Sequence, residues 1–169
     1  DARSSRAFAT RACGTALDAS MREAIESAAR DGDSVGGVVE CIIEGLPIGV
    51  GEPWFDSLES MLAHGIFSIP AVKGLEFGDG FRSASSRGSQ NNDPYRWNQG
   101  RIVTQGNSHG GILGGMSTGM PVLMRAAFKP TPSIARTQGT VDMERLVDAE
   151  VTVQGRHDPC IVTRAVAVV

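Results

Sequence analysis

Apolar residues recur with helical spacing in two stretches of the chain. In residues 21–30, the positions that would share one helical face are Met21, Ala24, Ile25 and Ala28. A second helix is predicted to begin at Pro53, because proline fits the first turn of a helix, and to end before Pro70. Its apolar face would hold Phe55, Leu58, Met61, Leu62 and Ile66. A further short helix is predicted over residues 9–19.

Apolar and polar residues alternate in two other stretches, which is the pattern of a half-buried β-strand. In residues 38–44, Val39, Cys41 and Ile43 share one face. In residues 121–129 one face is predicted to hold Val122, Met124, Ala126 and Phe128. The opposite face would present Arg125, Ala127 and Lys129. A strand with two cations on one face, ending beside a proline, favours an anion-binding surface.

The remaining segments are less regular. Residues 72–81 are predicted to be extended with glycine interruptions, and residues 150–154 form another short predicted strand. In residues 161–169 the β-branched content favours a strand, with a buried helix as the alternative. Residues 82–108 are polar, and such a segment is either a lid or binding loop or is disordered without its ligand.

Length and charge limit the class of protein. The 169 residues fit one domain, spanning residues 1–169, with 41% apolar and 21% charged residues. The net charge is −3, and no apolar run approaches the roughly 18 residues of a membrane-spanning helix. We therefore expect neither a nucleic-acid nor a membrane partner. Twenty-one glycines and 5% aromatic residues predict close backbone packing around small aliphatic side chains.

The cysteines and histidines form no metal-binding pattern. Cys13, Cys41 and Cys160 are widely spaced and no Cys-x-x-Cys is present, so we expect reduced thiols in an intracellular compartment. With three histidines and no HExxH spacing, no metal site is expected. The expected location is the cytoplasm, or a plastid if the source is a plant or alga.

Residues 1–11 contain three arginines, two serines and one acidic residue. Such a composition is typical of an organelle transit peptide. The competing interpretation is a functional Arg3-Ser4-Ser5 motif, and both remain open at this point.

Two short motifs in the last third of the chain combine cations with a constrained backbone. Residues 129–133 read Lys-Pro-Thr-Pro-Ser, where two prolines restrict the backbone around the hydroxyls. Residues 155–160 read Gly-Arg-His-Asp-Pro-Cys. Arg156 offers a planar pair of donors for phosphate or carboxylate, and His157 and Asp158 are acid–base candidates. A plain turn is the alternative for each motif. The glycine-rich residues 110–119 match no phosphate loop, which favours a structural role.

Together these motifs resemble the chorismate synthase family. Further matching segments are residues 32–37 (GDSVGG), 49–53 (GVGEP) with Phe55-Asp56, 68–74 (SIPAVKG), 88–89 with 92–93, and 164–166 (RAV). Each piece alone is weak, but the combined match is specific and is nearly continuous from about Met21 to the end of the chain.

The resemblance implies an α+β fold with helices sandwiched between antiparallel sheets, assembled as a homotetramer. It implies the anti-1,4-elimination of phosphate from 5-enolpyruvylshikimate 3-phosphate, which gives chorismate and needs reduced FMN. NADPH would be the reductant in members that also reduce flavin. Residues 82–108 would form a flexible active-site loop that closes over the flavin.

The resemblance also assigns roles to individual residues. Asp158 would relay the proton, and Ser5 and His157 are the other catalytic candidates. The implied FMN contacts are Arg3, Ser4, Ser5, Pro70, Ala71, Gly114, Lys129, Pro130, Thr131, Pro132, Ser133 and Arg156. The anionic groups of the substrate and cofactor would be held by Arg3, Arg125, Lys129 and Arg156.

Two features depart from the family pattern. The family's Arg-Ser-Ser-x-Arg-Glu-Thr lacks its acidic residue at residues 3–10, and the half that carries a further catalytic histidine has no counterpart. We therefore expect a truncated domain, either a fragment of the C-terminal half or the ordered part of a longer protein. The alternative function is a non-catalytic FMN-binding or assembly module on the same scaffold, and a generic flavin reductase is a third candidate.

Overall fold

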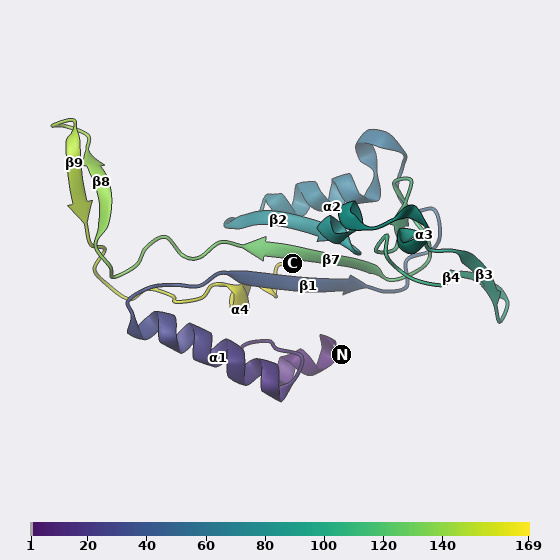
Figure 1. Ribbon diagram of the computed structural model, residues 1–169, viewed down its shortest axis with the longest axis horizontal. Helices are drawn as coiled ribbons and strands as arrows, with labels where there is room; N and C mark the ends of the chain where they lie inside the picture. Colours follow the sequence, from purple (N-terminus) through teal and green to yellow (C-terminus); the bar gives the residue numbers. More distant parts are fainter. Residues whose placement is uncertain (1) are drawn as a thin grey trace. The chain divides into compact units, whose positions relative to one another are not determined.

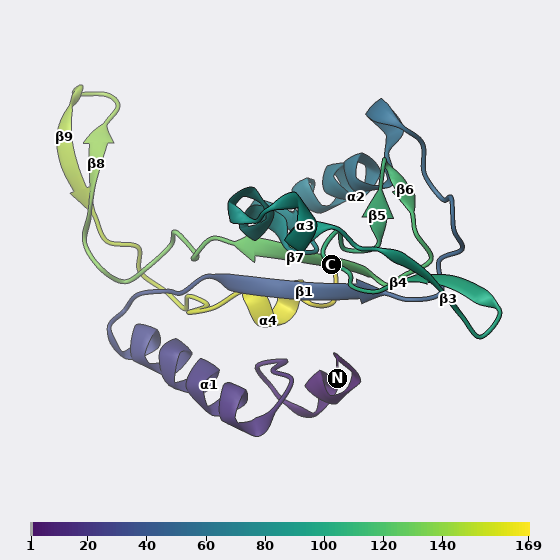
Figure 2. The same cartoon turned by 45° about the vertical axis from the view of Figure 1, so that its right-hand side comes forward.

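The computed structural model describes residues 2–169, with side chains described from Ser4 onward. The chain divides into two compact units, Asp1–Gly37 with Lys129–Val168 and Val38–Phe128 with Val169. Both units combine helices with antiparallel strands (Figures 1 and 2), which confirms the predicted α+β class. The grouping of residues 1–169 into a single domain stays a prediction.

The second unit is built on a three-stranded sheet with the order β1, β7, β2. These strands are β1 (Gly37–Ile43), β7 (Val122–Phe128) and β2 (Val72–Phe77). The central strand β7 pairs antiparallel with β2, and Figure 1 shows it running opposite to β1 as well. Every second residue of β7 is buried, namely Val122, Met124, Ala126 and Phe128. The strands predicted over residues 38–44 and 121–129 are therefore confirmed.

The helix predicted to begin at Pro53 begins later, at α2 (Leu58–Phe67), after a single 3-10 turn, η2 (Trp54–Asp56). Ser57 causes this delay, because its backbone is extended and its hydroxyl oxygen accepts the N–H of Ser60 at 3.1 Å, which caps the helix. Phe55 is 87% exposed and Met61 is 57% exposed, so their predicted places on the apolar face are wrong. Ile66 is buried as predicted, and α2 packs against β2.

The polar segment 82–108 contains secondary structure that its composition does not predict. It includes most of η3 (Gly80–Ser85), the turn of helix α3 (Gly88–Asn91), and a hairpin of β3 (Tyr95–Asn98) and β4 (Arg101–Thr104). A second, shorter hairpin, β5 (Ile112–Leu113) and β6 (Met116–Ser117), follows in the glycine-rich run. The role of residues 82–108 as a flexible active-site loop stays a prediction.

The first unit contains η1 (Ala2–Ala7), α1 (Thr15–Arg30), the hairpin β8 (Gln138–Asp142) and β9 (Val147–Val151), and α4 (Val162–Ala165). The two helices predicted over residues 9–19 and 21–30 are one helix that begins at Thr15. The strand favoured for residues 161–169 is wrong, because residues 162–165 form a helical turn that buries Val162 and Ala165. None of the described helices is long and apolar enough to cross a membrane.

A buried carboxylate fixes the start of α1. Asp18 is 8% exposed, accepts the Thr10 hydroxyl at 2.5 Å and accepts the Nε–H of Arg22 at 2.7 Å. The hydrogen bond from Thr10, followed by that from Arg22, holds the pKa of Asp18 below its ordinary value of 3.8. Because the folded pKa is lowered, this carboxylate stabilises the fold above pH 3.8, and that contribution is lost as the pH falls through the folded pKa.

We expect Thr10→Val to reduce the amount of folding stability that is lost as the pH falls. Urea unfolding followed by circular dichroism from about pH 5 to about pH 2 should show the unsubstituted chain losing more stability than Thr10→Val, because the variant no longer lowers the pKa of Asp18 as far. Thr15→Val, at an exposed position of the same helix, is the control and should keep the original slope. Identical slopes for the chain and for Thr10→Val would contradict the assignment.

Candidate active site

The two cation-bearing motifs of the first unit are joined through residues 33–36. The Ser34 hydroxyl donates to the carbonyl of Thr131 at 2.6 Å, although the two residues are 97 positions apart. The next residue, Val35, donates its N–H to the carbonyl of Pro159 at 2.8 Å. Successive residues of one segment therefore hold the motif 129–133 and the motif 155–160. Both motifs, and residues 32–37 that join them, are among the segments that resemble the family.

The motif 129–133 presents one cation and one unsatisfied hydroxyl. Lys129 is exposed and makes no ion pair with any described residue. The Thr131 hydroxyl oxygen is shielded from solvent and has no hydrogen-bond partner in the described part of the chain. The carbonyl of Pro132 accepts from the side-chain amide of Gln138 at 3.4 Å, and Ser133 is half-buried. An unsatisfied hydroxyl beside a free cation suits a polar ligand.

The three polar residues of the motif 155–160 differ in their contacts. Gly155 has φ +122°, where a residue with Cβ is strained, and Arg156 is exposed without an ion-pair partner among the described residues. A ring nitrogen of His157, Nε2, lies 3.0 Å from the carbonyl of Val153. Asp158 forms an ion pair with Arg164 at 2.9 Å. Arg156 is thus the residue of this motif that is free to meet an anion.

The predicted residues near the N-terminus lie in the same unit. Ser4 donates its hydroxyl to the carbonyl of Cys13 at 3.3 Å, and the carbonyl of Ser5 accepts the N–H of Phe8 at 3.2 Å. Both serines belong to η1. The side chain of Arg3, a predicted FMN contact, lies outside the described residues.

The other predicted FMN contacts belong to the second unit. Pro70 and Ala71 form the turn between α2 and β2, where Ala71 has φ +73°. A left-handed alanine costs about 1–3 kcal/mol and is typical of sites where geometry matters more than stability. Gly114 lies in the turn between β5 and β6 with φ +62° and open space around it. The predicted set is therefore divided between the two units.

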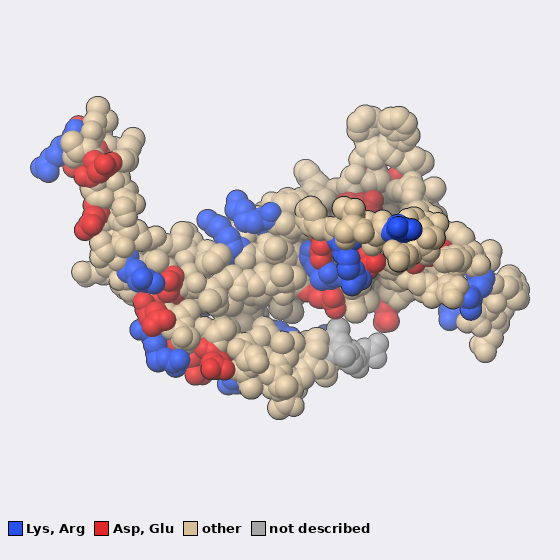
Figure 3. Space-filling view, in the orientation of Figure 1, with Lys and Arg blue, Asp and Glu red and all other residues tan. Residues whose placement is uncertain are grey.

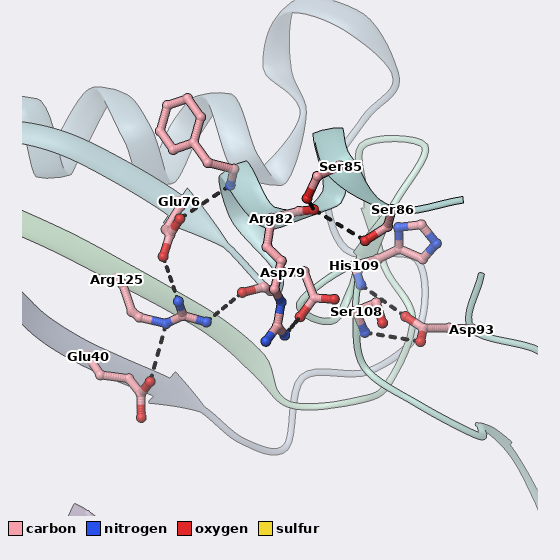
Figure 4. A network of polar contacts seen from close by, with 12 residues as sticks. Glu40, Glu76, Asp79, Arg82, Ser85, Ser86, Asp93, Ser108, His109 and Arg125 are labelled. Atoms are coloured by element: carbon pink, nitrogen blue, oxygen red, sulfur yellow. Dashed lines mark hydrogen bonds and ion pairs between the residues drawn. The ribbon is translucent and has the colours of Figure 1, made fainter. Parts of the chain in front are cut away.

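Arg125 already has partners within the second unit. Its Nη1 donates to Glu76 at 2.5 Å, its Nη2 donates to the carbonyl of Gly78 at 2.6 Å, and its Nε lies 3.3 Å from a carboxylate oxygen of Glu40 (Figure 4). With two carboxylates and a carbonyl around it, the guanidinium is already satisfied. Arg125 is therefore held by partners on β1, on β2 and just after β2, and its role in binding an anionic ligand together with Lys129 stays a prediction.

Asp93 links the two ends of the segment that contains the β3–β4 hairpin. Its two carboxylate oxygens accept the backbone N–H groups of Ser108 at 3.0 Å and His109 at 2.9 Å (Figure 4). Asn91, two residues earlier, keeps a shielded side-chain oxygen without a partner in the described part of the chain. Sequence reasoning singled out Asp93 through the family resemblance, but only the structure shows that its carboxylate is used internally.

Glu59 is a titratable group that sequence reasoning missed. It lies in the first turn of α2, and burial raises the pKa of its carboxyl above the ordinary value, an effect that the nearby His109 partly offsets. Nothing in the sequence indicates that a glutamate in a helix will have a raised pKa. Among the described residues, no cluster of histidine, cysteine and carboxylate side chains could hold a metal ion.

Comparison with known proteins identifies relatives along almost the whole chain. The family described as "Chorismate synthase" matches residues 2–169. The chain is 58% identical over 149 residues to a protein named "Chorismate synthase" from Korarchaeum cryptofilum, covering 88% of this chain and 41% of that protein. It is 56% identical over 145 residues to a protein of the same name from Dehalococcoides mccartyi, covering 86% and 40% respectively.

A solved structure agrees with these relatives. A structure described as "Crystal Structure of Chorismate Synthase" superposes with a TM-score of 0.72 at 32% identity, covering 76% of this chain and 39% of that one. The likeness confirms the predicted fold. The chain spans about 41% of the length of the Korarchaeum relative.

Proposed function

The chain belongs to the chorismate synthase family, and from this membership we propose that it forms part of a lyase that eliminates phosphate from 5-enolpyruvylshikimate 3-phosphate to give chorismate. The observation that carries the proposal is the joining of two motifs in the first unit, where residues 34 and 35 bond to Thr131 and Pro159. A substrate with one phosphate and two carboxylates needs several fixed cations. Lys129 and Arg156, both without an ion-pair partner in the described chain, supply two of them.

We further propose that the site holds reduced FMN. The shielded hydroxyl of Thr131, which has no described partner and follows Lys129 by two residues in the sequence, fits a group that offers hydrogen-bonding atoms and a phosphate. Residues 129–133 and Arg156 would bind it from the first unit, together with Ser4 and Ser5. Pro70, Ala71 and Gly114 stay proposed FMN contacts that rest on the family resemblance. Reduced flavin would lend electron density to the breaking C–O bond, with NADPH as the proposed external reductant.

Asp158 is the proposed proton relay. An ion pair with Arg164 at 2.9 Å holds its carboxylate in place, and a carboxylate is a group that can accept a proton. His157 is held by the contact of Nε2 with Val153. When Nε2 donates to that carbonyl, a neutral ring leaves Nδ1 as an acceptor, which suits a second proton-transfer group. Ser5 is the third proposed catalytic residue.

We expect removal of either free cation to weaken flavin binding. Lys129→Ala and Arg156→Ala should each raise the Kd for reduced FMN by about tenfold to a hundredfold, because a charge-assisted hydrogen bond contributes about 1.5–3 kcal/mol. Anaerobic calorimetric titration measures this Kd. Arg30→Ala, at another exposed arginine of the first unit, is the matched control and should leave the Kd unchanged. Equal effects of all three variants would mean that only overall charge matters.

A chimera tests the reaction itself. The matching segment of the Korarchaeum cryptofilum relative would be replaced by this chain, and chorismate formation would be followed with reduced FMN and 5-enolpyruvylshikimate 3-phosphate. Turnover supports the proposal. A folded chimera that binds FMN but forms no chorismate would instead support a non-catalytic module, and NADPH oxidation without the shikimate substrate would indicate a flavin reductase.

A further inference from the structure

The end of α1 is closed by a tight backbone turn that leads into residues 33–35. Gly32 has φ +65°, and its N–H donates to the carbonyl of Ala29 at 3.2 Å. The N–H of the next residue, Asp33, donates to the carbonyl of Ala28 at 2.8 Å. This pair of bonds around a left-handed glycine is the Schellman ending of a helix. Residues 33–35 therefore start from a fixed point on α1.

The chain between β7 and β8 contains the motif 129–133 and forms no regular secondary structure. Pro130 and Pro132 restrict the backbone of this motif, but neither has an N–H with which to form a backbone hydrogen bond. The two prolines thus limit the shape of the motif without fixing where it lies relative to α1. That placement has to come from other residues.

Residues 32–34 hold this stretch of chain at three points. The contacts are the Gly32 carbonyl with the N–H of Ala135 at 2.9 Å, the Asp33 carboxylate with Arg136 at 3.1 Å, and the Ser34 hydroxyl with the carbonyl of Thr131 at 2.6 Å. Figure 3 shows acidic and basic side chains around the connection between α1 and β1, where the ion pair lies. Of the three contacts, the bond from Ser34 is the one that reaches the motif 129–133 itself.

Ser34 is itself held on both sides. One carboxylate oxygen of Asp33 accepts the N–H of Ser34 at 2.8 Å, and the other accepts from Arg136. The bond from the N–H of Ser34, followed by that from Arg136, holds the pKa of Asp33 below its ordinary value of 3.8, so this acceptor is ionised at neutral pH. On the other side, Val35 is bonded to the carbonyl of Pro159. Ser34 therefore presents its hydroxyl to Thr131 from a rigid backbone.

We propose that Ser34 is a positioning residue of the FMN site. Its hydroxyl gives its hydrogen to the carbonyl of Thr131 and so orients that residue. The Thr131 hydroxyl, which is shielded and has no partner in the described part of the chain, is then directed toward the cofactor. Ser34 makes no contact with the cofactor in this arrangement and acts through Thr131 alone. The inference rests on the proposed function and adds to it a residue outside the predicted FMN contacts.

An isosteric pair of variants isolates the Ser34 hydroxyl. Ser34→Thr keeps the hydroxyl, whereas Ser34→Val replaces it with a methyl group in a side chain of the same shape, so both share any cost of the larger side chain. Without the hydroxyl, Thr131 can rotate in the free protein and has to be ordered again when the cofactor binds. We expect the Kd for reduced FMN to be about threefold to tenfold higher in Ser34→Val than in Ser34→Thr, measured by anaerobic calorimetric titration.

A double substitution tests whether Ser34 acts through Thr131. In a chain that already carries Thr131→Val, the further change Ser34→Val should raise the Kd by less than about twofold, because the hydroxyl that Ser34 orients is gone. A merely structural role of Ser34 would weaken binding by the same factor with and without the Thr131 hydroxyl. Ser20→Val, at an exposed serine of α1 whose hydroxyl donates to the carbonyl of Ala16 at 3.2 Å, is the control and should leave the Kd unchanged.

The outcomes separate this inference from the proposed function. Equal Kd values for Ser34→Thr and Ser34→Val would overturn the inference alone, and so would an undiminished further loss in the double variant. Failure of the unsubstituted chain to bind reduced FMN would overturn the proposed cofactor site and the inference with it. Circular dichroism of each variant checks that the fold is kept.

Discussion

Asp158→Asn is expected to lower the rate of chorismate formation by about a hundredfold to ten-thousandfold, because a positioned acid–base group contributes about that much. The chimera described above provides the assay, under single-turnover conditions that report the chemical step rather than product release. Asparagine keeps the size of the side chain but cannot take up a proton. The affinity for reduced FMN should stay within about twofold of its original value, because Lys129, Arg156 and the unsatisfied Thr131 hydroxyl remain in place.

The ion pair of Asp158 with Arg164 provides the control for this prediction. The Arg164 side chain is 71% exposed, so Arg164→Ala should cost little stability. If Asp158 acts only by holding Arg164, then Arg164→Ala and Asp158→Asn should lower the rate equally. If Asp158 relays the proton, Arg164→Ala should lower the rate by less than about tenfold, because the carboxylate that takes up the proton is still present. A large loss of FMN affinity in Asp158→Asn would reassign the residue to a structural role.

The second large effect concerns Gly111 in the glycine-rich run. Gly111 is buried with φ +81°, and a Cβ atom there would lie 2.5 Å from the carbonyl oxygen of Pro121 and 3.0 Å from that of Met120. Both neighbours are backbone atoms, so neither can move without displacing the start of β7. We expect Gly111→Ala to destabilise the second unit by about 2–5 kcal/mol, from the left-handed backbone and from overpacking. Hydrogen exchange at the amides of residues 122–128 measures the loss.

Gly114→Ala is the matched substitution in the same run. Gly114 also has a positive φ, +62°, but no atom lies within 4 Å of a Cβ built there. This variant should lose only the backbone contribution of about 1–2 kcal/mol. Protection of the β7 amides from hydrogen exchange should therefore be clearly lower in Gly111→Ala than in Gly114→Ala. Equal losses would show that backbone conformation alone explains the glycine-rich run and that close packing against Pro121 does not.

The sequence predicted those parts of the fold in which a local pattern reflects burial. In β7 alternate residues are buried, so the period of two in Val122, Met124, Ala126 and Phe128 was sufficient. The pattern failed where exposure is uniform. Residues of the β3 strand are all exposed, so nothing in their order indicates a strand, and only the pairing with β4 shows it. The strand prediction for residues 161–169 failed for a different reason. A high content of β-branched residues does not distinguish a strand from a short buried helical turn.

The candidate site was predictable as a set of motifs and not as a set of contacts. Lys129 and Arg156 were found from their residue type and from the family resemblance, and neither forms an ion pair with a described residue. Arg125 shares the strand face of Lys129, but Glu76 lies 49 residues earlier in the chain, and no local pattern reveals that the two side chains meet. The link from Ser34 to Thr131, across 97 residues, was equally hidden. Partners far apart in the sequence decide which cations can bind a ligand. The periodicity of the sequence does not reveal these partners.

The ion cluster around Arg125 has a consequence for how the sheet can misfold. Glu40 on β1, Arg125 on β7 and Glu76 on β2 form a row across all three strands. Sliding β7 by a single position would turn the guanidinium toward the side now filled by Met124 and Ala126, while two carboxylates would lose their counterion. The row therefore favours the observed register, because in this register the guanidinium meets a carboxylate on each neighbouring strand. The buried face of β7 opposes the same slip, because a shift by one residue would turn Val122, Met124, Ala126 and Phe128 away from the core.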